Sequence, residues 1–152
     1  MILGVPLWFI FALSASIVWG LGYVLSEQLL KTGITPAFLV MCQAIIVLPL
    51  YAISAWSLGN PAEEIRSVLS NKTLLFYMLI SSLAILGGNF LILYGISVKN
   101  ATMVSMIEIS YPFFIVLFSW LFFKDIQINW WTALGGVSIF TGVCIIYLKG
   151  GA

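Results

Sequence analysis

One carboxylic acid inside a long apolar stretch is the residue whose type and position point most directly to chemistry. The stretch covers residues 101–123, reads ATMVSMIEISYPFFIVLFSWLFF, and contains Glu108 about a third of the way along. Roughly 20 residues cross a bilayer as a helix. An ionisable group at the centre of such a helix costs about 2.5 kcal/mol or more and usually faces protein or a water-filled cavity. We interpret Glu108 as a titratable group in a transport pathway; the alternative is a protonated carboxyl that hydrogen-bonds a neighbouring helix.

A proline close to this acid indicates where the helix is disturbed. Tyr111 and Pro112 follow Glu108 within four residues, and Ser105 lies near the same helical face. Proline removes one backbone donor and leaves a carbonyl near Glu108 without its helical partner. We therefore expect a kink at Pro112 and a polar cavity along this face.

Aromatic and amide side chains on two other apolar stretches are candidates for the same cavity. Trp19, Tyr23 and Glu27 are spaced i, i+4, i+8 and share one helical face. That face either lines a substrate path, or carries packing aromatics and ends in an ion pair between Glu27 and Lys31. Asn89 lies in the middle of its stretch, where it either makes a structural hydrogen bond or lines the cavity.

The two remaining apolar stretches contain features of helix packing. Gln43 and Pro49 lie in one of them. We expect Gln43 to bond a neighbouring helix or a ligand, and Pro49 to kink its helix. Gly135, Ser138 and Gly142 form a stripe of small residues in the other, which favours close approach of a second helix and predicts dimer packing.

Composition defines the class of fold. The 152 residues are 62% hydrophobic and 7% charged, whereas soluble domains carry about 25% charged residues. We predict an all-α integral membrane protein, a bundle of five transmembrane helices that forms a single domain over residues 1–152. The expected spans are about 6–30, 36–58, 73–98, 101–123 and 129–148.

Several function classes lack the residues that they need. The chain has no His, which is the commonest metal ligand and the usual base near neutral pH. It has neither paired acids at catalytic spacing nor a nucleophile motif. We expect no enzyme activity, no metal and no cofactor. A net charge of +1 gives no argument for nucleic acid.

The positive charges give almost no orientation signal. The six Lys and Arg residues divide three against three between the two sides of the membrane. This balance fits a chain that inserts both ways and pairs antiparallel with itself. Five spans are also few to enclose a transport path across the membrane. Many transporters enclose such a path with two inverted repeats. We expect one repeat unit per chain, working as a homodimer or as a heterodimer with a similar chain.

Short motifs are spread along nearly the whole chain. They are Ile17-Val18-Trp19-Gly20 with Tyr23, Gly95-Ile96-Ser97, Asn100-Ala101-Thr102, Tyr111-Pro112, Asp125, and Gly135-Gly136 with Gly142. In these motifs the sequence resembles one half of an EamA-type transporter of the drug/metabolite transporter superfamily. The resemblance implies a five-helix bundle that exports or exchanges small metabolites or drugs.

These observations lead to two hypotheses of function. The preferred one is a dimeric secondary transporter in the prokaryotic inner membrane, in contact with lipid, that binds a small molecule at its midplane. Glu108 would exchange a proton for substrate, since burial of a carboxyl favours protonation and a nearby cation opposes it. The alternative is a non-transporting subunit that partners another membrane protein or a lipid-carrier flippase. The expected substrate-binding residues are Glu108, Asn89, Tyr111, Trp19, Tyr23 and Ser105.

Overall fold

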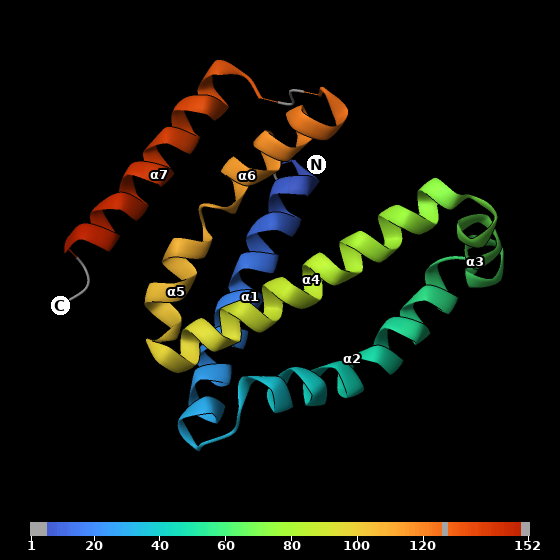
Figure 1. Cartoon of the computed structure of the whole chain (residues 1–152), viewed down its shortest axis with the longest axis horizontal. Helices are drawn as coiled ribbons and strands as arrows, with labels where there is room; N and C mark the ends of the chain where they lie inside the picture. The colour runs from blue at the N-terminus through green and yellow to red at the C-terminus, as the bar shows by residue number, and fades with distance from the viewer. Residues whose placement is uncertain (1–5, 126–127, 150–152) are drawn as a thin grey trace. The chain divides into compact units, whose positions relative to one another are not determined.

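The computed structural model of the protein describes residues 6–125 and 128–149, and every regular element in them is a helix (Figure 1). A helix satisfies its backbone N–H and C=O groups internally, as a segment in lipid must do. The elements in chain order are α1 (Leu7–Lys31), α2 (Pro36–Leu58), α3 (Pro61–Ser70), α4 (Lys72–Val98), α5 (Ala101–Glu108), α6 (Tyr111–Phe118), the π-helix η1 (Ser119–Phe123) and α7 (Trp130–Lys149).

Five segments within the described residues are long and apolar enough to cross a membrane. They are α1, α2, α4, the stretch Ala101–Phe123 and α7. Helices that are apolar on all sides are typical of membrane spans. The bounds of these segments differ by at most one residue from the spans expected from the sequence. The all-helical class and the five apolar segments are therefore confirmed.

The chain divides into two compact units, Met1–Ser97 and Val98–Ala152. In the first unit a tight turn reverses the chain between α1 and α2. Gly33 in this turn has a φ of +93°, a conformation that glycine adopts without steric cost. Thr35 then caps α2, because its Oγ1 accepts a hydrogen bond from the N–H of Phe38 at 3.3 Å.

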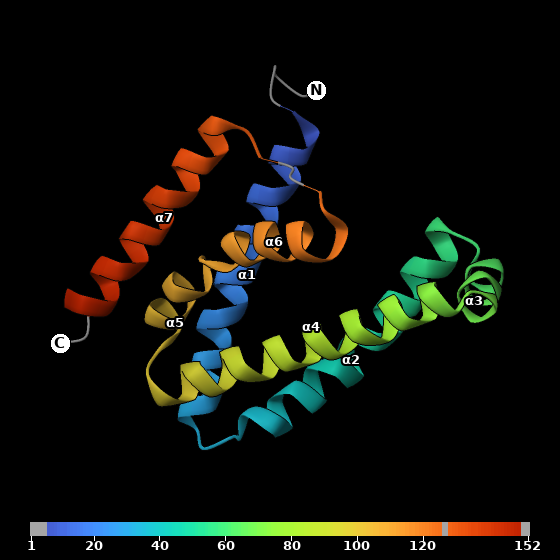
Figure 2. The ribbon, with the colours of Figure 1, turned by 45° about the horizontal axis from the view of Figure 1, so that its top comes forward.

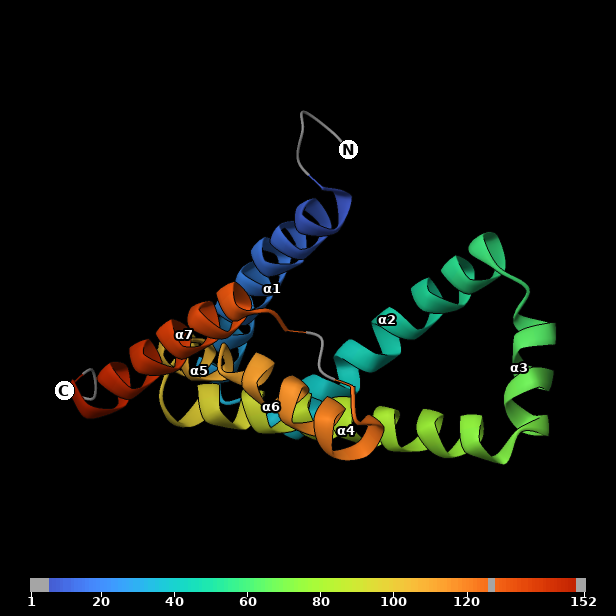
Figure 3. The ribbon, with the colours of Figure 1, turned by 90° about the horizontal axis from the view of Figure 1, so that it is seen from above.

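The short helix α3 connects the far ends of α2 and α4 (Figure 3). As a result α4 runs back toward the turn between α1 and α2, and its last part lies beside α1 (Figure 1). Pro49 lies inside α2, which runs without interruption from Pro36 to Leu58. The first unit thus contains three long continuous helices that approach one another near one end.

In the second unit the fourth membrane-length segment is not one continuous helix (Figure 2). α5 ends at Glu108, and α6 begins at Tyr111 after a turn at Ile109 and Ser110. The expected single helix with a kink at Pro112 is instead interrupted just before that residue. Proline has no N–H to offer the carbonyl of Glu108, four residues earlier, and is tolerated in the first turn of a new helix.

The last helix packs on the interrupted one within the second unit. The ring centroids of Phe113 in α6 and Phe140 in α7 lie 5.8 Å apart. By helical periodicity, the stripe of Gly135, Ser138 and Gly142 lies on the opposite face of α7 from Phe140. A Cβ added to either glycine would meet no atom within 4 Å. This surface has room for a second helix, and its role in dimer packing stays a prediction.

Candidate functional site

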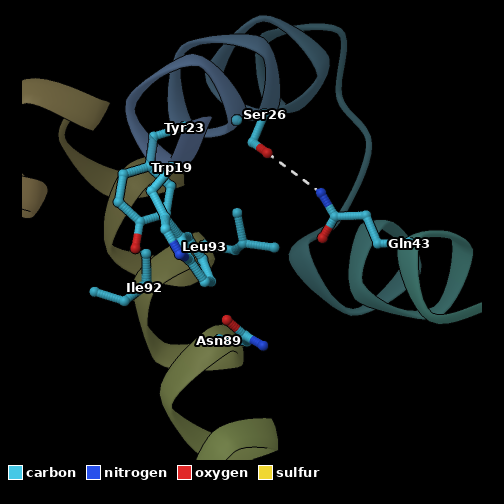
Figure 4. Close-up of a pocket in the computed structure, with 8 residues that line it drawn as sticks. Trp19, Tyr23, Ser26, Gln43, Asn89, Ile92 and Leu93 are labelled. Carbon is cyan, nitrogen blue, oxygen red and sulfur yellow. Dashed lines mark hydrogen bonds between the residues drawn. The ribbon is translucent and has the colours of Figure 1, made fainter. Parts of the chain in front are cut away.

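A pocket of about 100 Å³ lies in the first unit where α1, α2 and α4 approach one another (Figure 4). We call it the α1–α2–α4 pocket. Its walls combine aromatic, amide and hydroxyl side chains with apolar ones, and every lining residue comes from a membrane-length helix. The lining residues are Trp19, Gly22, Tyr23, Ser26, Gln43, Asn89, Ile92 and Leu93.

Two aromatic rings of α1 form one wall of the pocket. Trp19 and Tyr23 stand one helical turn apart, with ring centroids separated by 5.7 Å and planes tilted by 56°. Trp19 is 53% exposed, so its ring face remains available for a partner. The i, i+4 spacing noted in the sequence therefore brings both rings to one opening (Figure 4).

The side chains of Gln43 and Ser26, which are hydrogen-bonded to each other, form the next wall of the pocket. The Nε2 of Gln43 on α2 donates to the Oγ of Ser26 on α1 at 3.3 Å. Ser26 is only 4% exposed, which makes it the buried end of this contact. The expected helix–helix hydrogen bond of Gln43 is thus present, and the same side chain also lines the pocket.

The third wall contains an amide without a hydrogen bond to the rest of the described chain. Asn89 lies in the middle of α4 and is exposed at the pocket. No hydrogen bond of its side chain is present among residues 6–125 and 128–149. An amide at membrane depth needs a partner, because no bulk water is there to supply one. A ligand, a bound water or another chain can supply the hydrogen-bond partner of Asn89.

Glu27 forms an ion pair, whereas Trp19 and Tyr23 earlier on the same helix line the pocket. Its Oε1 pairs with the Nζ of Lys31 at 2.5 Å, one turn later on α1. The end-of-helix ion pair expected from the sequence is confirmed. Glu27 does not appear among the residues that line the α1–α2–α4 pocket.

The second unit places Glu108 at the point where the fourth span is interrupted. Glu108 is the last residue of α5, and its side chain is partly buried. The turn that follows is held by short-range bonds, from the N–H of Ser110 to the carbonyl of Ile107 and from the N–H of Phe113 to the carbonyl of Ser110, both at 3.1 Å. The carboxyl group is therefore carried on a half-helix end rather than on a continuous rod.

The residues expected to bind substrate are distributed over both units. Trp19, Tyr23 and Asn89 line one pocket of the first unit. Ser105, Glu108 and Tyr111 belong to the second unit, where Ser105 and Glu108 are partly buried and Tyr111 is exposed. Their contact with a substrate stays a prediction.

Ser26 lines the pocket but is not among the residues that the sequence predicts to bind substrate. Ser26 stands three residues after Tyr23 and seven after Trp19, so helical periodicity alone places it on the same face. Its role as the partner of Gln43 could not be inferred from spacing, because the two residues are 17 positions apart on different helices.

Five apolar helices of membrane length, some with polar groups at mid-span, define a multi-pass integral membrane protein. The chain belongs to the EamA-like transporter family, whose sequence model matches residues 6–148. The resemblance to an EamA-type half transporter is thereby confirmed. This family consists of transporters rather than enzymes. The comparisons with curated proteins and with solved structures found no match.

Proposed function

We propose that this protein is a secondary transporter that moves small metabolites or drugs across the membrane. The α1–α2–α4 pocket carries the proposal, because polar side chains inside membrane spans are costly and commonly mark substrate pathways. Three spans of the first unit contribute two hydroxyls, two amides and two aromatic rings to it. Membership of a transporter family supports the same conclusion.

Glu108 carries the coupling proton in this proposal. Discontinuous helices commonly form the substrate and ion sites of secondary transporters, and Glu108 ends such a half-helix. Ser105 and Tyr111, at either side of Glu108 in sequence, are proposed to contact the substrate.

We propose a dimer as the working form, with one inverted repeat from each chain and the substrate at its midplane. An odd number of spans suits this arrangement. The side chains of Gln43 and Asn89 are exposed in the single chain, and amides at membrane depth require protein, ligand or water around them. The partner is a second copy, in antiparallel orientation, or a similar chain. The prokaryotic inner membrane is the proposed location.

Transport by the purified protein tests this proposal. Proteoliposomes with an imposed pH gradient are supplied with amino acids, polyamines, other metabolites and cationic drugs. We expect saturable, gradient-dependent movement of at least one class, and its loss in Asn89→Leu. Asn60→Leu is the control, because Asn60 precedes α3 outside the membrane-length segments and makes no side-chain cap bond. Failure of every class, together with a stable complex with a different membrane polypeptide, would instead favour the non-transporting subunit.

A further inference from the structure

We infer that the α1–α2–α4 pocket selects an uncharged planar group that carries a hydrogen-bond donor and an acceptor side by side, as a carboxamide on a ring does. The inference rests on the proposed transport function, because it names the substrate class of the same site. It concerns which chemical group the pocket accepts, and it can fail while the transport proposal stands.

The charge balance of the pocket is the first argument. None of its eight lining residues carries a charge. The neighbouring acid on α1, Glu27, is paired with Lys31. A charged group taken out of water without a counter-ion costs far more than a hydrogen-bonded neutral group. A carboxylate would therefore find no compensating charge among the side chains that line the pocket. A cation would find only the ring faces of Trp19 and Tyr23, which attract it less strongly than a carboxylate counter-ion would.

The two amides supply the second argument. Gln43 directs its Nε2 toward Ser26, which leaves its carbonyl Oε1 as an acceptor (Figure 4). Asn89 offers both an N–H donor and a carbonyl acceptor toward the same space. A ligand carboxamide has the complementary donor and acceptor. Sites built to hydrogen-bond a ligand discriminate strongly against analogues that leave their polar groups unpaired.

The aromatic wall supplies the third argument. The rings of Trp19 and Tyr23 present a tilted pair of faces and edges beside the amides. Aromatic groups stabilise one another in offset or edge-to-face arrangements, beyond the effect of area burial alone. The cavity of about 100 Å³ is smaller than one of about 150 Å³ that binds benzene, so it has room for the carboxamide but not for the whole ring. The ring would lie against Trp19, which is 53% exposed.

Three isosteric probes test the inference on the full chain. Benzamide, benzoate and benzamidine have similar size and shape but are neutral, negative and positive. Binding of tritiated benzamide to purified protein in lipid nanodiscs is measured with each unlabelled compound as competitor. We expect benzamide to compete at concentrations about ten-fold lower than either charged analogue, which corresponds to about 1.4 kcal/mol. Equal competition by a charged analogue, or no specific benzamide binding, would overturn the inference.

A charge introduced into the pocket should change this preference. In Asn89→Asp the new carboxylate can pair with an amidinium, so we expect benzamidine to overtake benzamide. Asn60→Asp adds the same charge at the start of α3 and should keep the wild-type order. Asn89→Leu should lose benzamide binding while it retains the wild-type elution volume and helix content. If benzamide still competes better than benzamidine in a folded Asn89→Asp protein, the inference is contradicted. If that variant does not fold, the competition measured on the wild type decides.

The outcomes separate the two proposals. Transport of a charged solute by a protein that does not bind benzamide would refute the neutral-group inference and leave transport standing. Benzamide selectivity in a protein that moves no solute, benzamide included, would support the inference and refute transport.

Discussion

The two units of the chain hold polar side chains in different backbone settings. In the first unit, three continuous helices bring small neutral polar groups together, with a hydrogen bond from Gln43 to Ser26 across two helices. In the second unit, the span that carries the acid is interrupted beside that acid, and the pockets on α7 are lined mainly by apolar side chains. Neutral polar groups are thus held on continuous helices, whereas the ionisable group lies at a helix break.

This difference suggests a division of work between recognition and coupling. Continuous helices hold side chains at fixed spacing, which selective binding requires. A helix break places a titratable group where the backbone can change its dihedral angles, as hinge positions do. We propose that the α1–α2–α4 pocket makes the contacts that select the substrate and that the break at Glu108 couples binding to protons. Substitutions in the two units should separate these two roles.

Removal of the aromatic wall should weaken recognition more than changes to the helix break, to the interhelical hydrogen bond or to the ion pair of α1. In Trp19→Ala the lost ring contact should reduce affinity for the transported solute about ten-fold, since large aromatic anchors dominate binding energy. Equilibrium binding to purified protein measures this. Trp8→Ala is the matched control, because Trp8 lies on the same helix, is 70% exposed and does not line the pocket. Equal losses in both variants would remove the pocket from recognition.

Restoration of a backbone donor at the break should affect turnover rather than affinity. Pro112→Ala allows α5 and α6 to join, and we expect turnover to fall roughly three-fold, because a hinge position absorbs the change in dihedral angles. The equilibrium Kd should stay unchanged, because Pro112 does not line the α1–α2–α4 pocket. Initial rates in proteoliposomes measure turnover, and equilibrium binding measures Kd. Pro49→Ala is the control in the first unit, because Pro49 lies in an uninterrupted helix. A larger fall in turnover for Pro49→Ala than for Pro112→Ala would contradict the assignment of the break before Pro112 as the part that moves.

The contact between α1 and α2 should contribute modestly to stability. A double-mutant cycle with Ser26→Ala and Gln43→Leu should give a coupling energy of about 0.6 kcal/mol, the mean for hydrogen bonds between membrane helices. Unfolding by denaturant in detergent micelles measures it. A coupling energy indistinguishable from zero would show that the hydrogen bond does not hold the pocket together.

The ion pair at the end of α1 should matter least. Lys31 is 60% exposed, and exposed i, i+4 pairs contribute about 0.5 kcal/mol or less. Glu27→Gln should therefore change stability within that amount and leave solute affinity unchanged. Thermal unfolding and binding are compared with those of Lys31→Met, which breaks the same pair. A large loss of binding in Glu27→Gln alone would place the acid in the substrate path.

The fold could be predicted from the sequence because lipid leaves few choices. Backbone groups in a membrane must be satisfied within a helix, so each apolar run of about 20 residues defines a span. The aromatic wall of the α1–α2–α4 pocket could be predicted in part, since Trp19 and Tyr23 follow helical spacing. The contact of Ser26 with Gln43 could not, because it depends on how the turn at Gly33 aligns two helices. The break before Pro112 could not be placed either, because a proline predicts a disturbed helix and not whether a kink or a turn absorbs it.

One comparison of two variants tests the division of work most directly. Glu108→Gln and Asn89→Leu are assayed for binding, for solute exchange without a gradient and for uptake driven by a pH gradient. We expect Glu108→Gln to bind and exchange like the wild type while it loses gradient-driven uptake, and Asn89→Leu to lose all three. Gradient-driven uptake that survives in Glu108→Gln, or a binding loss there as large as in Asn89→Leu, would contradict the account.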